Sequence, residues 1–317
     1  MKRMGLLLLS LCACAGVGTP AAPANRDGGS SQMIPAARAQ NLLYVSDEGA
    51  NDVDVYAYPA GTRAGKLTNL AQPAGLCTDT LGDVWVVQSS SAKVTEFGHG
   101  GAKPIATLTI SGARRLLGCA VDPATGNLAV TDLGNSKGGG SLWVFARAQG
   151  IPKNYRDPKI SFAYFDGYDL GGNLFVDGLG RGSRFELAEL PKGAGELKDI
   201  ALYKSVGFPG GVHWDGKYVA IGDQDYQGRQ TSGIYQISVS GSRARVKGTT
   251  PLTGSCDVVQ FAFGRTGGKN GGQKNQVIGP DVCQNNVGFY QYPAGGSATK
   301  TLNGFQYPVG AALSLVK

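Results

Sequence analysis

Aspartates recur at the ends of short apolar segments in this chain. Four of them close such segments, a fifth follows one closely, and a sixth lies between two: Asp132, Asp177, Asp223 and Asp281, then Asp225, then Asp257. Carboxylate oxygens are the ligands that Ca²⁺ and other hard divalent cations prefer. Asp and Asn side chains also stabilise turns by accepting hydrogen bonds from the backbone. The pattern therefore fits either a divalent cation site or a set of turns, and turns are its commoner cause.

Histidine could supply acid–base chemistry at only two positions, His99 and His213. His213 lies in an apolar strand beside Trp214, where a histidine is more often a packed core residue than a base. To act as a possible base it would have to face a channel and have a partner. The sequence has no G-x-S-x-G elbow, phosphate loop or Cys/His zinc spacing. This pattern favours binding over catalysis.

The aspartates belong to a unit that the chain repeats six times. An apolar strand recurs about every 41 to 46 residues, and about 58 residues at the last step, where a Gly/Lys-rich insertion (265–274) intervenes. Its copies are residues 41–47, 83–88, 127–132, 173–177, 218–223 and 276–281. An outer strand, a Pro/Gly turn and an edge strand follow most copies, and Gly accounts for 50 of the 317 residues. The sequence therefore predicts an all-β protein, a six-bladed β-propeller of four-stranded antiparallel blades.

The two ends of the repeat predict how the ring closes. Residues 41–47 have no inner strand before them, whereas residues 310–316 form an inner strand with nothing after it. We expect the C-terminus to supply the inner strand and the N-terminus the other three strands of one shared blade, which leaves no open edge. Residues 41–317 then form a single propeller domain.

The inner segments resemble a known repeat. Three of them share a G-x-x-x-D pattern, at Gly75 to Asp79, Gly118 to Asp122 and Gly211 to Asp215, while Phe165 stands in place of Gly in a fourth. With the strands that follow, they resemble the NHL-type repeats of secreted, TolB-like six-bladed propellers, over essentially all of residues 41–317. The resemblance implies the fold and no single function, because such propellers include lactonases, a streptogramin lyase and binding scaffolds.

Gluconolactonase-type propellers hold a catalytic divalent metal in the channel with one Glu and several Asn or Asp residues. Asp132, Asp177, Asp223 and Asp281 stand in comparable places, but no Glu lies on an innermost entry loop to complete the set. The resemblance to the lactonases ends there.

Blade topology places the loop entering each inner strand and the loop leaving the second strand on one face. We therefore expect the six aspartates named above to share this face, with Glu48 and Gln224 among its other polar side chains. Tyr164, Phe208 and Tyr307 fall near the entry loops and could form a recognition surface, although core packing would explain them equally well.

Four cysteines follow residue 40. Cys256 and Cys283 fall on neighbouring loops of one blade, so we expect a disulfide between them. Cys77 and Cys119 lie on inner strands of adjacent blades at opposite parity and could face each other, but we expect two buried thiols there.

The N-terminus predicts export. Residues 1–24 combine Lys2 and Arg3 with a short leucine run and an A-x-A site, the layout of a signal peptide. The segment around Cys14 also resembles a lipobox, so lipidation at Cys14 is an open alternative. Residues 25–40 are rich in Ala, Pro, Gly and Ser and predict a flexible tether. The protein would then lie in the bacterial cell envelope, lipid-anchored or periplasmic, or be secreted.

The charge pattern limits the partners. The net charge is +7, or about +4 without the charged residues before residue 41, and the basic residues form no stripe interleaved with aromatics. Nucleic acid is therefore not an expected partner, and a membrane is expected only through a lipid anchor. We expect a monomeric recognition module that binds a protein, peptide or glycan through the loop face. The alternative is a metal-dependent lactonase or hydrolase, or a streptogramin-lyase-like enzyme, acting at an Asp-lined channel mouth with Ca²⁺ or another divalent cation.

Overall fold

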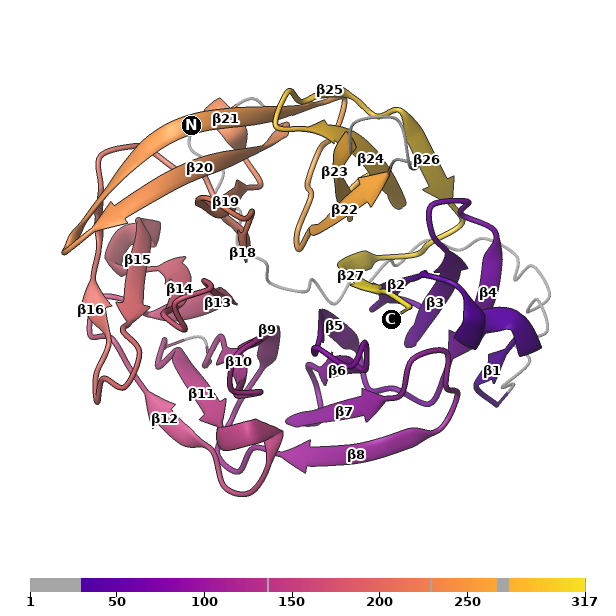
Figure 1. Ribbon diagram of the computed structural model, residues 1–317. Coiled ribbons are helices and arrows are strands. Elements are labelled where there is room, and N and C mark those ends of the chain that lie inside the picture. The colour runs from indigo at the N-terminus through magenta and orange to yellow at the C-terminus, as the bar shows by residue number, and fades with distance from the viewer. Residues whose placement is uncertain (1–29, 136, 229, 267–273, 317) are drawn as a thin grey trace, which may run out of the picture.

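The computed structural model describes residues 30–135, 137–228, 230–266 and 274–316. Six sheets stand around a common axis, as Figure 1 shows. The described residues contain no α-helix and four short 3-10 turns: η1 (Pro35–Ala39), η2 (Ala146–Ala148), η3 (Arg181–Ser183) and η4 (Tyr226–Gly228). None of these is long and apolar enough to cross a membrane. The chain is a six-bladed β-propeller, as its repeats predict.

Each blade has four antiparallel strands, which follow one another from the axis outward. Blade 1 consists of β27 (Pro308–Ser314), β2 (Leu42–Asp47), β3 (Asp52–Ala57) and β4 (Arg63–Leu67). Blade 2 consists of β5 (Pro73–Thr78), β6 (Val84–Gln88), β7 (Lys93–Phe97) and β8 (Pro104–Thr109). Blade 3 consists of β9 (Leu116–Val121), β10 (Leu128–Asp132), β11 (Ser141–Phe145) and β12 (Lys153–Tyr155).

The other three blades continue the ring. Blade 4 consists of β13 (Phe162–Tyr168), β14 (Leu174–Leu179), β15 (Phe185–Leu190) and β16 (Lys198–Asp199). Blade 5 consists of β18 (Pro209–Trp214), β19 (Val219–Asp223), β20 (Ser232–Ser240) and β21 (Arg243–Thr253). Blade 6 consists of β22 (Ala262–Thr266), β23 (Lys274–Asp281), β24 (Asn286–Tyr292) and β26 (Lys300–Asn303). The long β21 also pairs in parallel with β17 (Ala201–Leu202) and β25 (Gly296–Ser297), which ties blade 5 to both neighbours.

The ring closes through the shared blade, as the sequence predicts. The C-terminal β27 pairs antiparallel with β2, from Leu42 opposite Ser314 to Ser46 opposite Gly310. The side chain of Gln260 crosses this seam from blade 6 to blade 2: its Oε1 accepts the Leu76 N–H at 2.9 Å, and its Nε2 donates to the Leu76 carbonyl at 3.2 Å. The seam is therefore held by both a strand and a buried amide.

The predicted tether is wrong for its described part. β1 (Gln32–Met33) pairs with the outer edge of β4, η1 follows it, and Ala37 is fully buried. The physical reason is that β4 would otherwise present unpaired backbone groups, which β1 covers. The signal peptide and Cys14 lie outside the described residues.

Glycine lets neighbouring inner strands approach each other closely. A Cβ on Gly75 would lie 2.3 Å from the Leu117 carbonyl oxygen of the next blade, and one on Gly310 would lie 2.6 Å from that of Ala74. This is the physical reason for Gly in the G-x-x-x-D pattern. Its Asp caps the following turn: Asp79 accepts the N–H groups of Leu81 and Asp83 at 2.8 and 2.9 Å.

The expectation of free thiols at Cys77 and Cys119 is wrong. They form a disulfide between the inner strands of blades 2 and 3, with 5.7 Å between their Cα atoms. Cys77 on β5 and Cys119 on β9 face each other across the blade interface, and the close approach of these two strands brings the Cα atoms within disulfide range.

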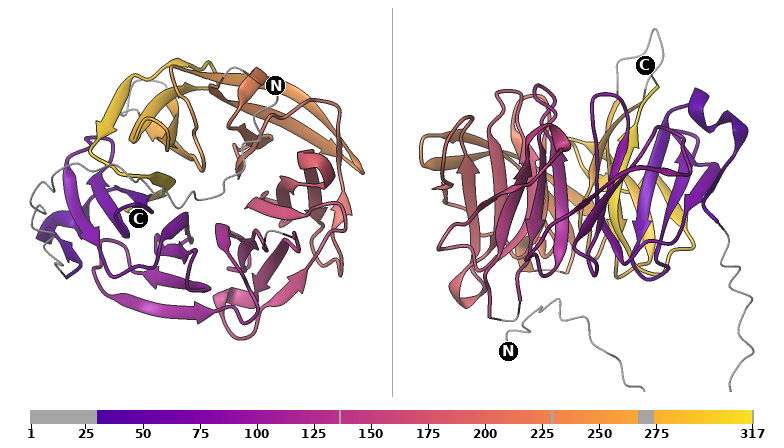
Figure 2. Two further views of the ribbon diagram at one scale, coloured as in Figure 1. Left: turned by 180° about the vertical axis from the view of Figure 1, so that it is seen from behind. Right: turned by 90° about the horizontal axis from the view of Figure 1, so that it is seen from below.

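The propeller has two faces, which the side view in Figure 2 separates. We call mouth face the one where each second strand ends beside the start of its inner strand. The paired residues Gln88 and Pro73, Asp132 and Leu116, and Asp223 and Pro209 mark it. The turns between these two strands form the opposite face.

Candidate ligand-binding face

The aspartates that end the second strands fasten the entry loops to their blades. Asp132 accepts hydrogen bonds from the backbone N–H groups of Arg114, Arg115 and Gly134 at 2.8–3.2 Å. Gly134 follows the strand, and the two arginines lead into the inner strand of the same blade. The Asp132 side chain therefore acts as a latch between the two loops, and we use this word for the equivalent residues.

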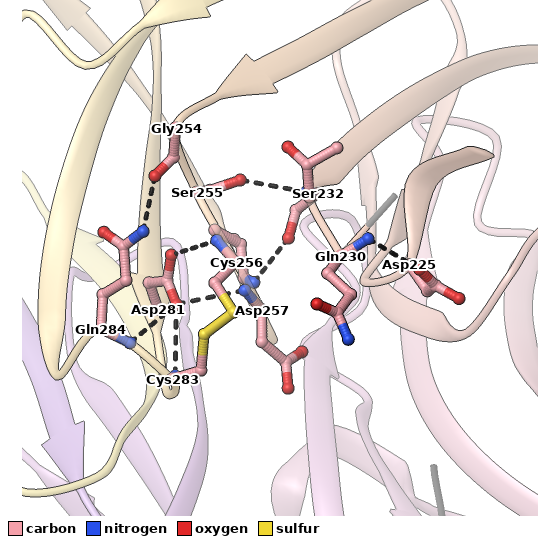
Figure 3. The surroundings of a disulfide bond; sticks show 12 residues. Asp225, Gln230, Ser232, Gly254, Ser255, Cys256, Asp257, Asp281, Cys283 and Gln284 are labelled. Carbon is pink, nitrogen blue, oxygen red and sulfur yellow. Dashed lines mark hydrogen bonds between the residues drawn. A yellow bond between two sulfur atoms is a disulfide. The ribbon is translucent and has the colours of Figure 1, made fainter. Parts of the chain in front are cut away.

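Equivalent latches occur in three other blades. Asp223 accepts the N–H groups of Gly207, Phe208 and Asp225 at 2.9–3.1 Å. Asp281 accepts four, from Cys256, Asp257, Cys283 and Gln284, most of which Figure 3 shows. Asp47 accepts three, from Ala50, Gln306 and Tyr307.

In blade 2 the amide oxygen of Gln88 takes the same role, accepting the Ala71 N–H at 2.9 Å. Most of the oxygens of these side chains are therefore occupied by backbone donors, and each side chain serves its own blade.

Asp177 does not act as a latch, and the prediction that it lies on the mouth face is wrong. In blade 3 Asp132 pairs with Leu116 beyond a bulge, whereas in blade 4 the equivalent residue is Gly178, paired with Ala163. Asp177 lies one residue earlier and so points to the other side of its sheet. It is fully buried, and its Oδ1 accepts the Phe165 N–H at 2.9 Å.

A second carboxyl lies in the same interior. Asp166 on β13 is 2% exposed, and neither of its oxygens has a hydrogen-bond partner among the described residues. Burial raises the pKa of Asp166 to about 8, and it raises that of Asp177 well above the ordinary value, with Asp166 adding to the effect. Blade 4 therefore contains two buried carboxyl groups, and burial favours the protonated, neutral form of each.

The opening at the axis gathers side chains from five blades. Its acidic and amide groups are Glu48 and Gln224, its apolar floor comes from Leu117, Phe165, Val259 and Val309, and its phenol rings are Tyr164 and Tyr307. The space between them is about 10 Å³, the size of one water molecule. The channel is therefore almost closed at this level.

Glu48 is the acidic group of this opening, and the sequence did not identify it as such. It follows β2 rather than preceding an inner strand, which is why the entry-loop pattern leaves it out of a channel set. Its backbone N–H donates to the Tyr307 carbonyl at 3.0 Å, which draws the side chain toward the axis. The side chain is 5% exposed, and burial raises its pKa while Arg115, 4.0 Å away, opposes this.

Asp257 extends the acidic rim toward blade 5. Figure 3 shows its carboxylate directed away from the disulfide that joins Cys256 and Cys283, whose Cα atoms are 5.9 Å apart. Burial first, then the nearby Asp281 and Asp225, raise the pKa of Asp257 to about 7. The Asp225 side chain accepts the Gln230 N–H at 3.1 Å. Three of the six predicted face residues, Asp177, Asp223 and Asp257, thus have a buried oxygen without a hydrogen-bond partner among the described residues.

His213 is separated from this opening. It lies four residues along β18 from Pro209, which is about 13 Å toward the opposite face. Its ring packs against Phe261, with 4.8 Å between the ring centroids, and burial lowers its pKa to about 4. Its surroundings are those of a packed aromatic residue between blades 5 and 6.

Side chains of metal-binding type come within 4.8 Å of one another in two groups of described residues. One is Cys256, Asp281 and Cys283, where both sulfurs are in the disulfide. The other is Asp79, Asp83 and Glu96 on the opposite face, where Asp79 caps a turn. The predicted Asp-lined mouth is thus a ring of separate latches.

Comparisons with known proteins bear on the fold. A scan against models of protein families found no match, and a search of curated proteins found none. A chain of a nidogen/laminin complex superposes with a TM-score of 0.62 at 14% identity, covering 87% of this chain and 99% of its own. A protein of unknown function from Bacteroides caccae gives 0.61 at 12% identity, with the same coverage. At these identities the likeness shows the fold alone.

A streptogramin B lyase structure is a more distant match. It gives a TM-score of 0.51 at 14% identity and covers 84% of this chain and 74% of that one. This likeness also concerns the propeller architecture. It transfers no active site to this chain.

Proposed function

We propose that this protein is an exported recognition module that binds a protein or peptide partner on its mouth face. The observation that carries the proposal is the combination of latched loops with a nearly closed axis. Because backbone bonds to Asp47, Asp132, Asp223 and Asp281 hold the loops, the face is ordered before a partner arrives, which lowers the entropy cost of binding. Because the space at the axis is only about 10 Å³, a ligand would make most of its contacts at the surface of this face.

The surroundings of the axis suit such a contact. Phe208 packs edge-on against Tyr164 with 5.3 Å between the ring centroids, and Tyr307 is half-buried beside them. Half-buried aromatic side chains are typical anchors of protein interfaces. A related fold in a nidogen/laminin complex supports a protein partner over a glycan.

The enzymatic alternative is weaker on this geometry. A lactonase, hydrolase or streptogramin-lyase-like activity at the mouth would need free carboxylates for Ca²⁺ or another divalent cation, and a cavity for a substrate. The predicted aspartates are mostly engaged with the backbone, and His213 lies about 13 Å away. Turnover of a lactone that depends on added Ca²⁺ would revive this alternative.

Export is part of the proposal. Two disulfides support it, because disulfides persist in oxidising compartments outside the cytosol. Residues 1–24 supply the signal, and either cleavage after Ala24 or lipidation of Cys14 would follow. Mass spectrometry of the mature protein from its native envelope distinguishes the two.

Site-specific crosslinking tests the proposed face. A photoreactive residue at Gln306, exposed on the mouth face, should capture a protein partner in the native envelope. The same residue at Lys217, exposed on the opposite face, should not. A partner captured from Lys217 and not from Gln306 would contradict the proposal.

A further inference from the structure

Two acceptor oxygens at the axis have no hydrogen-bond partner among the described residues. They are Oε1 of Glu48 and Oε1 of Gln224, and both side chains are only 5% exposed. The amide of Gln224 is held in this orientation because its Nε2 donates to the Pro209 carbonyl. A buried acceptor without a donor costs free energy, which a ligand bringing N–H groups would recover.

The charges around these oxygens favour a cation. Burial raises the pKa of Tyr307, and the nearby Glu48 and Asp257 add to this effect while Arg115 opposes it. Asp225 adds a further negative charge near Asp257. Arg115 already faces this site with a buried nitrogen, but its Nη2 is 4.0 Å from Oε1 of Glu48, beyond hydrogen-bond distance.

The size and lining of the opening narrow the choice of cation. A space of about 10 Å³ accepts one ammonium group but not a planar guanidinium. An ammonium has three donors and no acceptor, which matches a site made of acceptors. Calcium would need six to eight oxygens, more than the free oxygens of Glu48 and Gln224 provide.

The walls also fit the chain that carries such a group. The space holds the ammonium alone, above the apolar floor, so the aliphatic stem would lie toward the mouth beside Tyr164 and Tyr307, whose rings can attract the cation. The α-amine of a peptide is only one carbon away from the first peptide group, so that planar group would have to enter the narrow opening as well. A lysine side chain has four methylenes before the charge.

We propose that the partner inserts a lysine side chain at the axis, where its ammonium donates to Oε1 of Glu48 and Oε1 of Gln224. This inference rests on the proposed function, and it adds the chemical group that the mouth face recognises.

Binding of short capped peptides tests it, measured by ligand-detected NMR with the whole purified protein. The probe is acetyl-Gly-Gly-Lys-Gly-Gly-amide. Three comparators carry Arg at the centre, Nε-acetyl-lysine at the centre, or Ala at the centre with a free N-terminus. The lysine peptide should bind at least about tenfold more tightly than each comparator, because each lacks the compact, slim donor.

Glu48→Gln supplies the matched test on the protein. It removes the negative charge at the axis and should weaken the lysine peptide by about tenfold or more. Glu196→Gln makes the same change at an exposed position between β15 and β16 of blade 4 and should leave binding unchanged. Circular dichroism of both variants verifies that they are folded.

Several outcomes overturn the inference: equal binding of the lysine and acetyl-lysine peptides, a preference for arginine or for the free N-terminus, no effect of Glu48→Gln, or no binding of the lysine peptide up to about 10 mM. Crosslinking separates this failure from that of the proposed function. A partner captured from Gln306 equally well with Glu48→Gln leaves the recognition face standing and rejects the lysine. No capture from Gln306 rejects both.

Discussion

The strand ends around the ring and the opening at the axis present the same kinds of oxygen in opposite states. At the strand ends both carboxylate oxygens of Asp132 and of Asp281 accept backbone hydrogen bonds, and one oxygen of Asp223 accepts three. At the axis Glu48 and Gln224 are as deeply buried, yet an oxygen of each has no partner among the described residues. The difference teaches that residue type and burial alone do not predict which buried oxygens are satisfied in this propeller, because that depends on the backbone donors that each loop supplies.

The largest expected effect is the loss of a latch. Asp132→Ala removes the acceptor of three backbone N–H groups and should lower the free energy of unfolding by about 3 kcal/mol in urea denaturation. Asp132→Asn keeps one acceptor oxygen and should cost less. An unchanged stability in Asp132→Ala, combined with loss of a bound divalent cation, would make Asp132 a ligand instead of a latch.

The next largest effect is expected for a buried amide whose oxygen and nitrogen both have hydrogen-bond partners. Gln260 at the seam is 1% exposed and bonds both backbone groups of Leu76. Gln260→Ala should cost about 2 kcal/mol, because those two groups then lose their partner near a closed axis. Gln306→Ala, at an exposed position, should change the melting temperature little. If both variants melted like the parent, the seam would not depend on this side chain.

The buried carboxyls of blade 4 give a smaller effect that depends on pH. The pKa of Asp166 is raised from 3.8 to about 8, so the folded state keeps a proton that the unfolded chain releases above about pH 4. The cost to stability therefore grows as the pH rises from about 4 to about 8. Asp166→Asn should melt above the parent at pH 8 and close to it at pH 4, with Glu196→Gln as a control without this trend. A gain that does not vary with pH would contradict the burial of an ionisable group.

The repeats made most of the fold predictable, because the period of the strands and the missing inner strand at residue 41 follow from sequence alone. The shift at Asp177 could have been predicted from the spacing, because Asp177 is the fourth residue after Asn173 whereas Asp132 is the fifth after Asn127. The bulge between Ala163 and Asp166 does not cause the shift, since blades 2, 3 and 5 have the same bulge. The place of Glu48 at the axis was not predictable, because it depends on a backbone hydrogen bond to Tyr307, at the other end of the chain.

The cysteines form one disulfide that the sequence predicted and one that it did not. The pair at Cys256 and Cys283 follows from loops that share a blade. The disulfide between Cys77 and Cys119 required the distance between two blades, which is set by the approach of Gly75 to the Leu117 carbonyl.

Glu48→Gln tests the central claim most directly, when its melting temperature and its binding of the lysine peptide are measured on the same sample. Because Glu48 has an unpartnered oxygen and a pKa raised by burial, its neutral replacement should leave the melting temperature unchanged or slightly higher. Binding should fall by about tenfold or more. A variant that melts well below the parent and binds the peptide as the parent does would show that Glu48 is a structural acid like Asp132, and would contradict the account.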